Sequence, residues 1–160
     1  MIKLLGGINL NKYTPREYIV ANTDLMSIEK IKQFESEKKS FTINSIYRSR
    51  NVGQSYFSSV LTTLIALFNA IPLIFRLKPN LLLVNGPGTC LPLCLIFYLY
   101  SRIFFCKNNK IIFIESICRV KTLSLTGKIL YYLNIADSFI VQWPDLQLKY
   151  KKAIYLGRLI

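Results

Sequence analysis

The sequence contains no histidine and only 8 acidic residues, against 21 lysines and arginines. Without histidine the commonest general base is missing, and no Ser-His or Cys-His pair can form. Carboxylates do not fill the gap, because Glu115 and Asp137 are the only ones between Glu37 and Asp145. The chain therefore lacks a complete set of acid and base groups, and we assign no catalytic residue.

Common nucleotide and metal motifs are missing as well. The sequence has no Gly-x-Gly-x-x-Gly or Walker loop, and its four cysteines lack the paired spacing of a zinc site. We therefore predict no cofactor and no metal. The cysteines are expected to be reduced, buried or half-buried thiols of a cytosol-facing protein; they are Cys90, Cys94, Cys106 and Cys118. The N-terminus has too short an apolar run for a signal peptide.

What the sequence has in excess is apolar surface and positive charge. Hydrophobic residues make up 52% of the chain, and the formal net charge is +13. A charge of this size favours phosphates or an anionic membrane leaflet as partners. Nucleic acid is not predicted, because the basic residues are scattered and the apolar runs are long. At 160 residues the chain is expected to form one domain, residues 1–160.

Short apolar segments alternate with helical ones along most of the chain. Such alternation predicts a parallel sheet with helices packed on it, because parallel strands need crossover connections. The fold class is therefore predicted to be α/β. The predicted strands are 18–22, 41–46, 81–84, 111–114 and 138–141, and the predicted helices are 28–37, 56–75, 91–105, 121–133 and 145–151.

Two stretches, 52–75 and 81–101, carry no charged residue and are about as long as a membrane span. Polar residues interrupt the first, and the second opens on a turn. We favour core or membrane-facing helices, with Pro72 bending or ending the first of them. The alternative is a small integral membrane protein with two spans, over 52–75 and 81–105, and no transferase role.

Three polar clusters follow three of the predicted strands. The segment 85–89 (NGPGT) joins a strand to a helix, where close backbone approach and free N–H groups suit a diphosphate. In the segment 115–119, Glu115 is suited to orient a sugar hydroxyl and Arg119 to pair with phosphate. The third cluster is the basic loop 48–55. Taken singly, the first cluster is equally a tight turn and the second equally a local ion pair or helix cap, whereas the third is better explained as a solvated loop than as a ligand site.

The fold brings the three clusters to one edge of the sheet, where ligands of open α/β folds bind. Their convergence favours a binding site over three unrelated loops. The candidate acceptor- and diphosphate-binding residues are Arg48, Gln54, Ser55, Asn85, Gly86, Gly88, Thr89, Glu115, Ser116 and Arg119.

Longer motifs resemble one known family. The segments 85–90 (NGPGTC), 115–128 (ESICRVKTLSLTGK) and 139–144 (FIVQWP) are similar to the membrane-anchoring subunit of a two-subunit UDP-N-acetylglucosamine transferase. That transferase adds the second sugar to dolichol-diphosphate-N-acetylglucosamine. Segments 18–27, 48–55 and 155–159 extend the resemblance over essentially the whole chain.

The resemblance implies a Rossmann-like domain that forms the acceptor-side half of a GT-B glycosyltransferase. It implies attachment to the cytosolic face of the endoplasmic reticulum membrane. It also implies a separate cytosolic catalytic subunit, recruited by the C-terminal tail, residues 152–160. The tail residues expected to dock this partner are Leu156, Gly157, Arg158, Leu159 and Ile160. A complete transferase acting alone is the disfavoured alternative, since histidine is absent.

The sequence departs from the family at its N-terminus. Members of the family normally place an anchor, a first strand and a glycine-rich loop bearing a histidine before the helix that residues 1–5 continue. In a Rossmann-like sheet the first strand is central, so its absence would separate strand 18–22 from strand 81–84. Either these strands close up or exposed edges remain. We expect a chain that is marginally stable on its own, not catalytic alone, and, because the missing loop carries the histidine expected to serve the acceptor, inactive even with its partner present.

Overall fold

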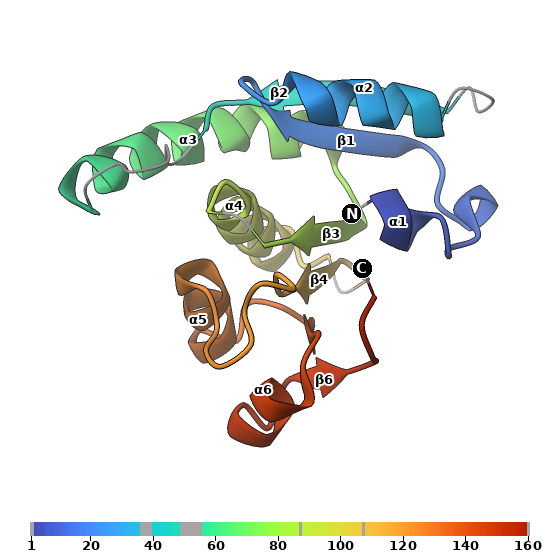
Figure 1. The fold of residues 1–160 in the computed structure, drawn as a ribbon. Coiled ribbons are helices and arrows are strands. Elements are labelled where there is room, and N and C mark those ends of the chain that lie inside the picture. The colour runs from blue at the N-terminus through green and yellow to red at the C-terminus, as the bar shows by residue number, and fades with distance from the viewer. Residues whose placement is uncertain (1, 36–39, 49–55, 87, 107, 160) are drawn as a thin grey trace.

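A computed structural model describes residues 2–35, 40–48, 56–86, 88–106 and 108–159, without the side chains of residues 3 and 56–59. Its helices and its single 3-10 turn are α1 (Ile2–Leu5), η1 (Leu10–Lys12), α2 (Leu25–Phe34), α3 (Tyr56–Leu77), α4 (Cys90–Ile103), α5 (Leu125–Tyr132) and α6 (Pro144–Lys149). Its strands are β1 (Arg16–Ala21), β2 (Phe41–Ile46), β3 (Leu81–Asn85), β4 (Lys110–Ile114), β5 (Ser138–Val141) and β6 (Ile154–Tyr155). The alternation confirms the predicted α/β class (Figure 1).

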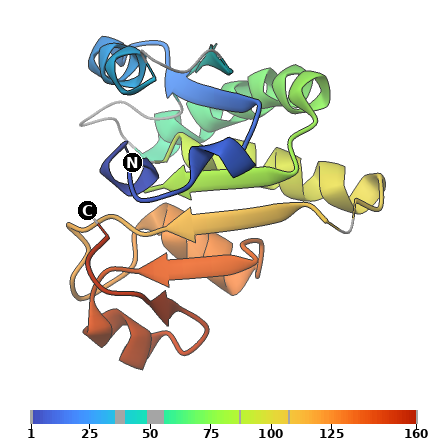
Figure 2. The same cartoon turned by 90° about the vertical axis from the view of Figure 1, so that its right-hand side faces the viewer.

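The strands form two parallel sheets. One has the order β1-β2, and the other has the order β3-β4-β5-β6. Every strand pairing is parallel, with Leu82 beside Ile111 and Phe113 beside Phe139 in the larger sheet. Figure 2 shows the arrowheads of β1, β3, β4 and β5 directed to the same side. The carboxyl ends of both sheets therefore face one way, as a Rossmann-like fold requires.

The strands β1 and β3 do not pair with each other in the part of the chain that the structure describes. We expected either that these two strands would close up or that exposed edges would remain. Closing up is wrong, and β1 and β3 are edge strands of two separate sheets. In both views of the ribbon, the N-terminal segment with α1 lies next to this gap (Figures 1 and 2). The two sheets are joined instead through α3, whose Arg76 Nη2 donates to Oδ1 of Asn44 on β2 at 2.5 Å.

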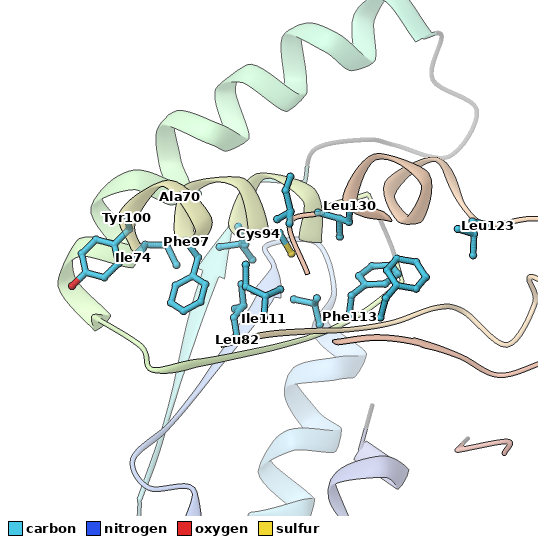
Figure 3. Close-up of a cluster of buried hydrophobic side chains, with 14 of the residues drawn as sticks. Ala70, Ile74, Leu82, Cys94, Phe97, Tyr100, Ile111, Phe113, Leu123 and Leu130 are labelled. Carbon is cyan, nitrogen blue, oxygen red and sulfur yellow. The ribbon is translucent and has the colours of Figure 1, made fainter. Parts of the chain in front are cut away.

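The main core lies between the larger sheet and the helices α3 and α4 (Figure 3). Phe97 on α4 and Phe113 on β4 are fully buried, and Ala70 and Ile74 bring α3 against them. Ile46 at the end of β2 belongs to the same cluster. Each fully buried side chain of this size contributes about 1.5–3 kcal/mol of transfer free energy, so this cluster is what holds the two sheets together.

Several helix limits differ from the predicted ones. Pro72 does not end α3, which continues to Leu77; because Pro72 is exposed, the carbonyl that loses its donor is not sealed in the core. The helix predicted over 28–37 begins at Leu25 and ends at Phe34, and Asp24 caps it by accepting the N–H of Ser27 at 3.1 Å. The segment 81–105 divides into β3 and the 14-residue α4, so it is not one continuous span.

The cysteines are free; Cys94 is buried, and Cys90 and Cys106 are partly buried. Burial raises the pKa of the Cys90 thiol to about 11, and it also raises the pKa of Cys94. Cys118 is exposed, so the expectation of four buried or half-buried thiols is wrong at that position. Cys118 lies in the loop after β4, on the surface of the protein.

A buried ion pair fastens the N-terminal segment to β1 and α2. Glu35 is 1% exposed, and its carboxylate accepts hydrogen bonds from Arg16 Nε and Nη2, both at 2.8 Å, and from Tyr18 Oη at 2.6 Å. Arg16 Nη1 also donates to the carbonyls of Leu10 and Tyr13. Removing one partner of such a pair costs more than the pair contributes, because a buried charge is left alone.

The Tyr18 hydroxyl gives this cluster a dependence on pH. Burial, and after it the hydrogen bond to Glu35, raises the pKa of Tyr18 to about 12. The unfolded chain loses this proton near pH 10, so the folded protein loses stability as the pH rises from 10 to 12. We expect urea midpoints to fall in that range. Tyr18→Phe should reduce the corresponding loss in the free energy of unfolding by about 1 kcal/mol at most after solvent screening. An equal fall in both proteins would contradict this assignment.

Candidate functional site at the carboxyl ends of β3, β4 and β5

Two loops at the carboxyl edge of the larger sheet lie against each other. Gly86, directly after β3, has a φ of +77°, and a Cβ there would lie 3.6 Å from the Cβ of Ser116. The left-handed backbone favours glycine at this turn. The predicted clusters 85–89 and 115–119 are therefore side by side. This agrees with the rule that loops after the carboxyl ends of neighbouring parallel strands meet at one edge of the sheet, here called the strand-end rule.

The N-terminus of α4 follows the first loop. Thr89 stands at the capping position, but its side chain makes no capping hydrogen bond. The N–H of Leu91 is bonded to the Gly88 carbonyl at 3.1 Å, and Pro92 has no N–H. The first turn of α4 therefore offers fewer backbone donors than an ordinary helix start. Any anion held here needs a further positive group, which the adjacent loop supplies.

Glu115 lies at the end of β4 and is fully buried. Its Oε2 accepts the N–H of Ser124 at 2.9 Å and the Ser124 hydroxyl at 3.0 Å, while its Oε1 accepts the N–H of Ser116 at 2.9 Å. Ser124 in turn caps α5, since its hydroxyl accepts the N–H of Gly127 at 2.9 Å. The carboxylate thus closes the loop 115–124 on itself, and its contacts are those of a helix-cap network.

Arg119 is exposed on the same loop, and its N–H donates to the Ser116 carbonyl at 3.0 Å. Within the described residues its guanidinium has no hydrogen-bond or ion-pair partner. A guanidinium that is not already paired is suited to a phosphate or carboxylate group. Two charged side chains of the loop 115–124, Arg119 and Lys121, are exposed and have no partner within the described residues, so both are left for a ligand.

The third predicted cluster is described only in part. Arg48 follows β2, and its Nη1 donates to the Thr23 hydroxyl at 3.3 Å, at the end of the smaller sheet. This places Arg48 beside the β1-α2 turn. Gln54 and Ser55 lie outside the described residues, so the convergence of the third cluster with the other two stays a prediction.

Gln142 and Trp143 follow β5, and sequence reasoning did not include them in the site. Gln142 is fully buried, and its Nε2 donates to the Glu115 carbonyl at 3.0 Å. The Trp143 indole N–H donates to the Ile117 carbonyl at 2.7 Å. Applying the strand-end rule to strand 138–141 would have found both. They fix the backbone of the loop that carries Ser116 and Arg119.

The C-terminal tail passes over Trp143. The strand β6 pairs with β5, and the tail then turns at Gly157, which has a φ of +89°. The guanidinium carbon of Arg158 lies 4.2 Å from the centre of the Trp143 ring, a cation–π contact of about 0.5–1 kcal/mol at an exposed site. Leu156 is 60% exposed, Leu159 is partly exposed, and Ile160 lies outside the described residues. Leu156 is thus available to a partner.

One cavity lies away from this edge. A cavity of about 580 Å³ lies between the C-terminal ends of α4 and α5, at the starts of β4 and β5. Its charged lining includes Lys110 and Asp137, which are paired with each other at 3.0 Å. Because it opens at the amino ends of the strands, it lies apart from both candidate loops.

An apolar surface runs along α3. Of the described residues, only the stretch Val60–Leu77 is a helix long and apolar enough to cross a membrane, and 22% of it is buried. The large apolar side chains that α3 exposes, here called the α3 face, are Val60, Leu61, Leu64, Ile65, Phe68, Ile71 and Phe75. The aromatic pair Phe75–Phe104 extends the surface to the end of α4, where Phe105 is 84% exposed. Contiguous apolar patches of this kind mark interaction sites.

Comparison with known proteins decides the family. Residues 1–159 match the family described as "Oligosaccharide biosynthesis protein Alg14 like". The chain belongs to this family. Among Alg14 relatives, the human "UDP-N-acetylglucosamine transferase subunit ALG14" is 47% identical over 169 residues, covering 100% of this chain and 76% of the human protein. The proteins of the same printed name from Yarrowia lipolytica and Schizosaccharomyces pombe are both 40% identical, covering 100% and 98% of this chain and 74% and 75% of the relatives.

Proposed function

We propose that this chain is the acceptor-side, membrane-recruiting subunit of a UDP-N-acetylglucosamine transferase in the synthesis of the N-glycan precursor. The observation that carries the proposal is the similarity, over the whole of this chain and 76% of the human relative, to proteins named as subunits of that transferase. The chemistry agrees with a subunit role, because the sequence has no histidine and the buried Glu115 is engaged in holding a loop. The chain supplies binding and position, and a second protein supplies the catalytic groups.

The acceptor is a dolichyl-diphosphate-linked N-acetylglucosamine, bound at the carboxyl edge between Gly86 and Arg119. The unpaired guanidinium of Arg119 and the start of α4 bind the diphosphate, while Ser116 lies next to the turn at Gly86. Glu115 acts through the loop and not on the sugar directly. Residues 1–160 form one Rossmann-like domain, the acceptor-side half of a GT-B enzyme.

The partner is a cytosolic catalytic subunit, and the tail 152–160 is its docking segment. Leu156 exposes an apolar side chain next to the turn at Gly157, and Arg158 adds a charge that no described acidic side chain neutralises. An exposed apolar and cationic segment of this kind is suited to recognition by another protein.

The membrane is that of the endoplasmic reticulum, on its cytosolic face, and the α3 face is the surface that meets it. No acidic residue occurs between Glu37 and Glu115, so α3 and α4 carry no negative charge, and Arg76, Lys78 and Arg102 lie at their C-terminal ends. An apolar helix face flanked by cations suits the boundary of an anionic leaflet.

The test is co-expression with the catalytic subunit, followed by pull-down and sugar transfer to a short-chain dolichyl-diphosphate-N-acetylglucosamine. Arg119→Ala should lower transfer about 10-fold or more, by loss of a charge-assisted phosphate contact, with the partner still bound. Deleting residues 156–160 should abolish pull-down first. Failure of the intact chain to retain the partner contradicts the proposal, and equal loss of pull-down and transfer in Arg119→Ala would make that residue structural.

A further inference from the structure

Trp143 lies between the two functional segments of the chain. Its indole N–H donates to the Ile117 carbonyl at 2.7 Å, within the loop 115–124. Its ring carries the Arg158 guanidinium at 4.2 Å, within the docking tail. One side chain therefore contacts both the proposed acceptor loop and the proposed partner-docking segment, which are 41 positions apart from Ile117 to Arg158.

The hydrogen bond from the Trp143 indole holds the middle of the loop 115–124. Its two ends are fastened by Glu115, through Ser124 at one end and through the Gln142 amide at the other. Between Ser116 and Leu123, the Trp143 indole makes the only hydrogen bond that reaches the described loop from another element. Arg119 lies two residues after Ile117, so the indole sets the place of the backbone that presents this guanidinium.

In the docking tail, the position of Arg158 on the Trp143 ring is free to change. Gly157 has a left-handed φ of +89°, and a Cβ there would meet nothing within 4 Å. Arg158 is exposed, and within the described residues its charge is paired only with the Trp143 ring. Trp143 itself is partly exposed. A protein that binds the tail is therefore in a position to hold Arg158 on the ring or to move it away.

We infer that Trp143 is a positioning residue which couples partner docking at the tail to acceptor binding at the loop. This inference rests on the proposed function. Binding of the catalytic subunit immobilises Arg158 on the indole, the indole keeps its N–H on the Ile117 carbonyl, and Arg119 is held ready for the diphosphate. Because coupling between two binding equilibria is reciprocal, the acceptor must raise the affinity for the partner by the same factor.

The experiment measures that factor in the full chain. The Kd of the catalytic subunit is determined with and without a short-chain isoprenyl-diphosphate-N-acetylglucosamine in detergent. A hydrogen bond of ordinary net strength corresponds to a coupling of about 5-fold. Trp143→Phe keeps a ring for Arg158 but removes the N–H donor, so it should reduce the factor to about 1, whatever its effect on the Kd of the partner alone. The matched control is Leu148→Ala, since Leu148 is 80% exposed on α6.

A second measurement needs no substitution. Trp143 is the only tryptophan of the chain, so 5-fluorotryptophan incorporated into this chain alone gives a single fluorine resonance. We expect the resonance to move when the partner binds and again when the acceptor analogue is added. A resonance that ignores the analogue, or a coupling factor unchanged in Trp143→Phe, overturns the inference and leaves the proposed function standing. A wild-type chain that binds neither ligand overturns both.

Discussion

Replacing Gly127 with alanine is expected to unfold the candidate site. An added Cβ would lie 2.3 Å from Glu115 Oε2 and 3.0 Å from Ser124 Oγ, both far inside ordinary contact. Neither group has room to withdraw, because Glu115 is fully buried and Ser124 caps α5. Overpacking and disruption of a buried, hydrogen-bonded carboxylate together cost about 3–5 kcal/mol. For a domain of this size the melting temperature should fall by about 10 °C or more.

The sign of this effect is diagnostic. In an ordinary helix interior, glycine to alanine stabilises by about 1 kcal/mol, so a melting temperature that rises would refute the packing described here. Gly7→Ala is the control, since a Cβ there would meet only the Leu4 carbonyl at 3.7 Å. Thermal melts followed by circular dichroism should leave Gly7→Ala within about 0.5 kcal/mol of the wild type.

A double mutant separates the clash from other causes. Glu115→Ala removes the carboxylate that the added Cβ would strike, so combining Gly127→Ala with it should cost much less than Gly127→Ala costs in the wild type. Residues in contact are non-additive in this way, by about 0.5–3 kcal/mol. Simple additivity would mean that the cost of Gly127→Ala comes from its backbone and not from Glu115.

The regular parts of the fold were predictable from local patterns. The strands 41–46 and 138–141 were placed at their observed limits, because each is a short apolar or alternating run bounded by polar residues. The strand β6 and the turn η1 are too short to leave a pattern. The start of α5 was placed four residues early, although Ser124 followed by Gly127 is a readable cap.

The candidate site was predictable in its position and not in its contacts. The strand-end rule put Gly86 and Ser116 on one edge, where the structure brings them together. The same rule could not show that Glu115 is occupied by Ser124, because that contact needs the loop to return over nine residues. Nor could it show that Arg158 stacks on Trp143, since the two meet only after β6 has paired with β5.

Placing a charge on the α3 face is expected to release the chain from lipid. Phe68 is 71% exposed near the middle of α3, and burial of a phenylalanine side chain is worth about 1.5–3 kcal/mol. Phe68→Glu also adds a negative charge that an anionic leaflet repels. We expect binding to phosphatidylserine-containing vesicles to weaken about 30-fold or more in sedimentation assays. Folding should be unaffected, because the side chain lies outside the core.

The control is the same change at another exposed apolar side chain, Leu148→Glu. Leu148 is 80% exposed on α6, which lies at the opposite end of the molecule from α3 in Figure 1. Added salt should weaken the vesicle binding of both variants, because it screens the basic residues. The ratio of their affinities should persist, because it comes from apolar contact. Equal binding of the two variants would refute the assignment of the α3 face. Extraction with alkaline carbonate distinguishes the two ways in which α3 can meet the membrane. A chain that lies on the membrane surface is released, and a chain whose α3 spans the membrane stays in the pellet.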